Sequence, residues 1–298
     1  MRDIPGPLPA LVVLTAFFAL AGMDAVIKYL TDSFHVGHIV AFRYWFGALV
    51  ALPFFLAARG PRFSAEILGQ SSIRAILVTM AAYCFFYALS IIPLAEATAL
   101  AFTAPLFVVL FARLILKEPI PSVAVISVGI GLAGVLVMIW DDLGNDDGLS
   151  GELLGAGLVL AAALGYSLVM VLTRLHSVRA APAVMVFSQT IVAAFITLPL
   201  LFMTWQLMDT RELALFALVG VLGSTAHLGL AWAFSSANAA RLSPLEYSVL
   251  PWAVVFGYLF FAEIPEVDTL IGAVMIVAAC LLVVYWQARS MRSAKQSA

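Results

Sequence analysis

A few ionisable side chains stand inside otherwise apolar stretches of this sequence, and they are the first residues that could do chemistry. Asp24 and Lys28 are four residues apart, which places both on one face of a helix. Arg43 follows a short polar turn at about the same distance as Asp24 precedes it. Acid and base placed in this way either neutralise each other as a structural ion network or form a gate.

Two further titratable residues, Glu246 and His227, lie inside later apolar stretches. Near Glu246 the sequence offers no basic residue except Arg241, so the carboxyl is a candidate for carrying a proton or binding an amino group. His227 can bind a carboxylate or relay a proton, because imidazole donates, accepts and titrates near neutrality. The alternative for both is a structural hydrogen bond, to hydroxyls for Glu246 and to a neighbouring helix for His227.

Hydroxyl-bearing and aromatic residues complete the candidates for a binding site. Tyr83 and Tyr87 are four residues apart, and a tyrosine away from the membrane interface needs a partner for its hydroxyl. This favours the lining of a cavity, with simple packing as the alternative. Further candidates for substrate binding come from the kinked and repeat-related spans and are Thr98, Ser167, Tyr247 and Trp252.

Enzymatic chemistry has no recognisable pattern here. A membrane enzyme would need a nucleophile with a base, paired carboxylates or a metal triad, and none occurs at a recognisable spacing. His35 and His38 lack a third metal ligand. Residues 129–134 match the dinucleotide pattern GxGxxG, but they lie within one apolar stretch, which favours close helix packing. We therefore expect no enzyme, metal or cofactor.

These residues must be positioned by membrane-spanning helices. Hydrophobic residues make up 64% of the chain and charged residues 11%, whereas about a quarter of the residues of soluble domains are charged. A span needs about 20 apolar residues, and continuous runs favour helices over barrel strands. The predicted spans are residues 9–30, 37–58, 72–92, 94–116, 120–140, 151–175, 182–203, 212–235, 240–262 and 267–288.

Charge sets the expected orientation and partners. Once the spans are counted, most basic residues fall on one side, which by the positive-inside rule puts both termini in the cytoplasm of a bacterial-type inner membrane. A cleaved signal peptide is the alternative for the N-terminus, since Arg2 precedes an apolar run. The dispersed basic residues and a net charge of −2 predict no nucleic-acid partner. Expected partners are the lipid bilayer and a small-molecule substrate, with protons as a hypothesis.

The second half of the chain echoes the first about 145 residues later. Ala81, Ala88 and Ala95 align with Ala226, Ala233 and Ala240, and Pro105 aligns with Pro251 at an offset of 146. The halves are expected at residues 1–145 and 146–298, and five spans in each would make them inverted relative to each other. The predicted fold is all-α, with ten transmembrane helices as two inverted five-helix repeats. Mid-span prolines bend helices, so Pro105 and Pro251 are candidate hinges.

The run from Gly22 to Leu30, the Ala41-Phe42-Arg43 that follows, and prolines 105 and 251 each leading to an acid (Glu118, Glu263) resemble the ten-helix EamA-type carriers of the drug/metabolite transporter superfamily. The resemblance implies a central site that carries amino acids, nucleotide-like metabolites or drugs across the inner membrane. We expect alternating-access export of amino acids. The alternatives are uptake of a methionine-derived or nucleotide-like metabolite, drug efflux, or a non-transporting assembly subunit.

Overall fold

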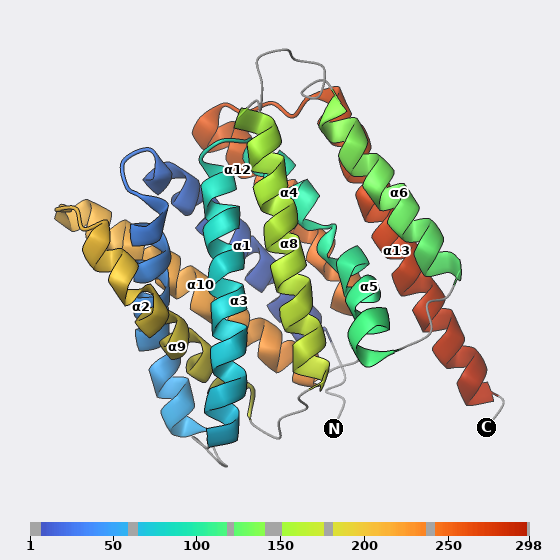
Figure 1. The fold of residues 1–298 in the computed structure, drawn as a ribbon, viewed down its shortest axis with the longest axis horizontal. Coiled ribbons are helices and arrows are strands. Elements are labelled where there is room, and N and C mark those ends of the chain that lie inside the picture. The colour runs from blue at the N-terminus through green and yellow to red at the C-terminus, as the bar shows by residue number, and fades with distance from the viewer. Residues whose placement is uncertain are drawn as a thin grey trace.

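The computed structural model describes residues 7–58, 65–117, 122–140, 151–175, 181–236 and 242–296, and all regular structure in these ranges is helical (Figure 1). The elements of the first half are α1 (Leu8–Thr31), α2 (Val36–Ala57), α3 (Ala65–Leu89), α4 (Leu94–Ala101), α5 (Ala104–Leu116) and α6 (Ser122–Met138). Those of the second half are α8 (Gly151–Leu175), α9 (Pro182–Met203), α10 (Thr210–Ser236), the 3₁₀ helix η1 (Ser243–Ser248), α12 (Val249–Phe261) and α13 (Val267–Gln296).

These elements confirm the predicted membrane fold. Eight helical segments are long and apolar enough to cross a membrane, and Ser122–Met138 and Val267–Leu282 are shorter apolar helices. The fourth span consists of α4 and α5, and the ninth of η1 and α12. Glu118, Arg241 and the expected junction around residue 145 lie outside the described residues.

Helix packing shows that the two halves are related as inverted repeats. α1 packs along α10, and α3 packs along α8, so the first helix of each half lies against the third helix of the other. The remaining equivalent helices pair directly, α2 with α9 and α6 with α13, the latter pair at one edge of the molecule (Figure 1). An odd number of spans in each half makes equivalent helices run in opposite directions.

Helix ends repeat between the halves as well. α5 ends on Lys117 and α12 ends on Ala262, both with the left-handed backbone that is uncommon outside glycine. At other ends, side chains satisfy the free backbone N–H groups. His35 Nδ1 accepts from the Gly37 N–H at 3.0 Å, and Asp209 and Glu212 form a reciprocal capping box at the start of α10.

Close approach of backbones holds α6 against α13. A methyl group added at Gly272 would lie 2.6 Å from the Gly134 carbonyl oxygen, and Gly131 packs on Leu106. By contrast, Gly129 has nothing within 4 Å of an added methyl group. The expected close packing of residues 129–134 is therefore found at Gly131 and Gly134, where small residues allow helices in a membrane to approach.

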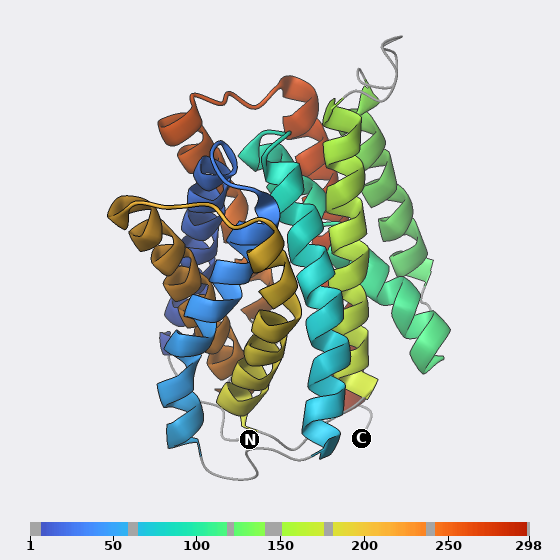
Figure 2. The same ribbon diagram turned by 60° about the vertical axis from the view of Figure 1, so that its left-hand side comes forward.

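α1 begins and α13 ends at the same end of the molecule (Figures 1 and 2). We call this the terminal end, and we call the opposite one the distal end. The distal end carries the connections from α1 to α2, from α3 to α4, from α9 to α10 and from α12 to α13. These two ends give the depth at which each candidate residue lies.

Candidate substrate site

The fourth span is broken at the predicted hinge. Pro105 lies in the first turn of α5 and has no N–H to offer the Ala101 carbonyl. Before it, the N–H groups of Phe102 and Thr103 bond three residues back, at 3.2 and 3.0 Å. The helix is therefore interrupted here and not merely bent, because the residues before the proline form a turn with bonds to the third residue back instead of the fourth.

Side chains from two other helices contact the backbone at this break. The Cys280 thiol of α13 donates to the Phe102 carbonyl at 3.2 Å, and the Ser167 hydroxyl of α8 lies 2.8 Å from the Ala104 carbonyl. In a bilayer no water replaces such partners, so irregular backbone persists only where protein satisfies it. Ser167, a predicted substrate-binding residue, therefore contacts backbone at this break.

The ninth span has its own irregular segment, and it faces the first break. η1 precedes α12, and Pro251 lies in the first turn of α12, as Pro105 does in α5. The Tyr247 ring of η1 packs on Phe102 with centroids 5.1 Å apart, and its hydroxyl lies within electrostatic range of the Cys280 thiol. The two proline breaks therefore meet across the two halves of the molecule.

Glu246 adjoins this meeting point, in the terminal half of the ninth span. Its carboxyl lies within electrostatic range of Tyr247, of Cys280 and of Tyr166 on α8. Sequence reasoning missed Tyr166, because nothing in the spacing relates it to Glu246. We call Phe102, Tyr166, Glu246, Tyr247 and Cys280 the break cluster.

Charged residues converge near the middle of the bundle. The Arg43 guanidinium carbon lies 4.7 Å from the Tyr44 ring centroid and 5.8 Å from that of Phe86 on α3. Asp24 and His227 both lie within electrostatic range of Arg43. Asp24, Arg43 and His227 thus form a central charged site that draws on α1, α2 and α10.

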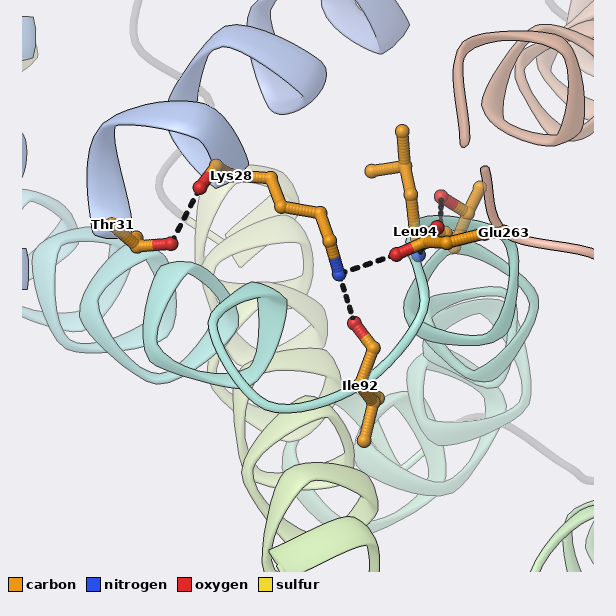
Figure 3. A network of polar contacts seen from close by, with 6 residues as sticks. Lys28, Thr31, Ile92, Leu94 and Glu263 are labelled. Carbon is orange, nitrogen blue, oxygen red and sulfur yellow. Dashed lines mark hydrogen bonds and ion pairs between the residues drawn. The ribbon is translucent and has the colours of Figure 1, made fainter. Parts of the chain in front are cut away.

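Lys28 does not pair with Asp24. Its ammonium group lies 2.7 Å from a Glu263 carboxylate oxygen and donates to the Ile92 carbonyl at 2.7 Å (Figure 3). The other Glu263 oxygen accepts the Leu94 N–H at 2.8 Å. Lys28 thus has partners outside the predicted set of Asp24, Lys28 and Arg43, because its long side chain reaches the distal loops. We call the contacts of Lys28, Glu263, Ile92 and Leu94 the distal latch.

Other predicted site residues lie apart from these groups. Tyr83 stacks on Tyr87 and approaches His35 at the distal end, with ring centroids 6.5 and 6.4 Å apart. Thr98 donates to the Leu94 carbonyl of its own helix. Trp252 packs edge-on against Phe18 of α1, with centroids 4.9 Å apart.

Polar groups thus follow one another through the bundle from the distal to the terminal end. The distal latch comes first, and Asp24 lies one helical turn below Lys28, about 6 Å along α1. The break cluster lies in the terminal half. Among the described residues, no group of three or more His, Cys, Asp or Glu side chains could hold a metal ion.

Comparison with known proteins identifies relatives of this chain. The chain is similar to the S-adenosylmethionine uptake transporter of Rickettsia prowazekii (strain Madrid E), at 28% identity over 92% of this chain and 91% of the relative. The pseudopaline exporter of Pseudomonas aeruginosa (strain UCBPP-PA14) is also 28% identical, over 91% of this chain and 94% of the relative.

A solved crystal structure with 18% sequence identity covers 94% of this chain and 97% of its own with a TM-score of 0.62, which supports the fold alone. The sequence profile of one family matches twice, at residues 7–140 and 153–285. Those matches cover the two inverted halves on which the breaks, the central charges and the latch are built. The chain belongs to the EamA-like transporter family, within the drug/metabolite transporter superfamily.

Proposed function

We propose that this transporter carries small amino-acid-type metabolites by alternating access. The observation that carries the proposal is the meeting of two proline breaks, one from each inverted half, in a bundle whose interior also holds charged groups of both signs. Broken helices at the interface of inverted repeats supply both the flexible points and the polar surface that a mid-membrane site needs. Rocking of one half against the other would expose this site to each side in turn.

The charges of the central site and the names of the relatives together support one class of substrate. The relatives are named for uptake of S-adenosylmethionine and export of pseudopaline. A methionine derivative bears an ammonium and a carboxylate group, and the central charged site offers one carboxylate and one guanidinium group. Export of amino acids is our first proposal for direction, and uptake of a methionine-derived metabolite is the second, favoured by the rickettsial relatives.

Orientation and repeat boundary belong to the same proposal. We place both termini in the cytoplasm of an inner membrane and the distal end outside, because the basic residues gather at the terminal end. The halves would meet between the two profile matches, consistent with a boundary at residue 145. The closed distal latch then corresponds to a state shut toward the outside.

Reconstitution in liposomes tests the proposal. Purified chain is preloaded with unlabelled solute, and counterflow of labelled methionine, other amino acids, S-adenosylmethionine and a cationic dye is compared with that in protein-free liposomes. Selective counterflow of the amino acids or of S-adenosylmethionine supports amino-acid-type transport, and unequal flux under opposite gradients tests direction. Selective dye flux would support drug efflux instead, and absence of all flux would favour an assembly subunit.

A further inference from the structure

Asp24 and Arg43 stand close to each other in the interior without pairing. Among the described residues the ion pair is Lys28–Glu263, so the Asp24 and Arg43 side chains stay beyond the 4.0 Å limit of an ion pair. Neither side chain makes a hydrogen bond within the described part of the chain, and the Arg43 Nε is buried without a partner. Intramembrane charges are normally paired, so this separation needs an explanation.

Three helices converge on the unpaired charges. A methyl group added at Gly223 of α10 would lie 3.7 Å from the Arg43 Nε and 2.8 Å from the sulfur of Met23, the neighbour of Asp24 in α1. Cation–π contacts with the rings of Tyr44 and Phe86 help to position the guanidinium. Asp24 is half-buried on the face of α1 that packs toward this site.

His227 adds an acceptor to the same site. One ring nitrogen, Nδ1, lies 2.6 Å from the Gly223 carbonyl oxygen, which can only accept a hydrogen bond. The proton of a neutral imidazole is therefore on Nδ1, and Nε2 carries a lone pair. An ammonium group can donate to such a nitrogen as it does to a carboxylate.

We propose that Asp24 binds the ammonium group and Arg43 binds the carboxylate group of a zwitterionic α-amino acid head, which fills the space between the two side chains. This inference rests on the proposed function and names the part of the substrate that this site recognises. A zwitterion leaves the net charge of the site at zero, so no uncompensated charge enters the low-dielectric interior. A ligand with a single charge would leave one of the two groups unpaired.

The distal latch determines which side supplies this site. Lys28 lies one turn beyond Asp24 on the same face of α1 and is tied to the loop before α4 and the loop after α12. In the proposed site, those contacts would keep the zwitterion from reaching Asp24 from the distal end. The zwitterion then enters and leaves from the terminal end.

Binding to the full chain in detergent tests the pairing of groups. The probes are L-methionine, methylthiopropylamine, which lacks the carboxylate, and methylthiobutanoate, which lacks the ammonium. For the unmodified chain, each analogue should bind about tenfold more weakly or worse, as expected for loss of a charged hydrogen bond. Asp24→Asn should lower the affinity for methionine about tenfold. This variant should then bind methionine no more tightly than methylthiobutanoate, but still more tightly than methylthiopropylamine. Arg43→Gln should do the reverse.

Matched controls separate this role from a structural one. Asp32→Asn and Arg211→Gln remove the same groups at exposed distal positions and should leave all three affinities unchanged. Should Asp24→Asn fail to fold, Asp24→Glu displaces the carboxylate by one methylene and should weaken the two ammonium-bearing probes more than the acid. Equal losses for all three probes in either variant, or unchanged discrimination, would overturn the inference.

The same measurements show whether the proposed site fails by itself or together with the proposed function. If methionine shows counterflow in liposomes but both variants keep the ratios of the three probe affinities, the proposed site is wrong and the proposed amino-acid transport is still supported. A chain that transports only the dye and binds none of the three probes would remove the proposed substrate class, and the inference with it.

Discussion

Among single residues, Glu246 combines depth in the membrane with polar neighbours that cannot neutralise it. Tyr166, Tyr247 and Cys280 lie within electrostatic range, and all three are hydrogen-bonding groups rather than cations. A carboxyl in such surroundings exchanges a proton more readily than it forms a permanent ion pair. We therefore propose Glu246 as the residue at which a proton gradient would act on transport.

Replacement of Glu246 by glutamine tests proton coupling. The unmodified chain should respond to an imposed pH gradient across liposomes, whereas Glu246→Gln should transport at a rate that the gradient no longer changes. Glu266→Gln, at an exposed position in the loop before α13, is the matched control and should keep the response. A flux that is insensitive to the gradient in the unmodified chain would reject coupling and leave facilitated diffusion.

At the scale of elements, the distal latch connects α1 to both distal loops of the broken spans. Both side chains of the ion pair are mostly buried, 15% exposed for Lys28 and 16% for Glu263. A charged hydrogen bond in such a place contributes about 1.5–3 kcal/mol. This is large enough to bias an equilibrium between a closed and an open distal end.

Lys28→Met keeps the apolar stem and removes the charge, so it should release the distal end. Spin labels at Ser33 and Ile264, with both native cysteines replaced by serine, report the distance between the α1–α2 turn and the α12–α13 loop. Their distance distribution should be narrow with Lys28, broader and longer with Lys28→Met, and narrow again with Lys28→Arg. Identical distributions for Lys28 and Lys28→Met would show that the ion pair does not hold this end closed.

The crossing of α6 and α13 gives a second prediction at this scale. Gly272→Ala should destabilise the protein by about 1–3 kcal/mol, because the added methyl group meets the Gly134 carbonyl at 2.6 Å. Gly129→Ala, where nothing lies within 4 Å, should be neutral or stabilising by up to about 1 kcal/mol. Thermal unfolding in detergent measures both, and equal midpoints would contradict the close crossing.

For the whole molecule, inversion of the halves makes the two ends chemically different. The loops at the distal end include acidic residues of the capping box and the latch, whereas the sequence assigns most basic residues to the connections between spans on the other side. By the positive-inside rule, loops rich in Lys and Arg stay on the cytoplasmic side when a chain inserts into the membrane. Orientation is therefore a property of the whole chain rather than of one helix.

Labelling from outside the cell tests this orientation. With the native cysteines replaced, Ile264→Cys, at a distal position that is 77% exposed, should react with a membrane-impermeant maleimide in intact cells. Ala181→Cys, at the start of α9 near the terminal end, should react only after permeabilisation. The opposite pattern would place the termini outside and reverse the proposed orientation.

The sequence alone was enough to predict the membrane class, ten spans and their inverted repetition, because hydropathy and an odd span count act along the chain. It also located both prolines at equivalent positions. Local patterns cannot tell a bend from a break, however, since the outcome depends on whether other helices satisfy the freed carbonyl groups. Cys280 does this for the Phe102 carbonyl, from 178 residues along the chain.

Partner choice among the charges was likewise decided by tertiary structure. The i to i+4 spacing placed Asp24 beside Lys28, but the lysine stem reaches Glu263, which follows the ninth span. Only the folded chain leaves Asp24 and Arg43 close together and unpaired. Hydrophobic patterning is read within each segment, whereas the pairing of buried charges depends on which segments the packing brings together.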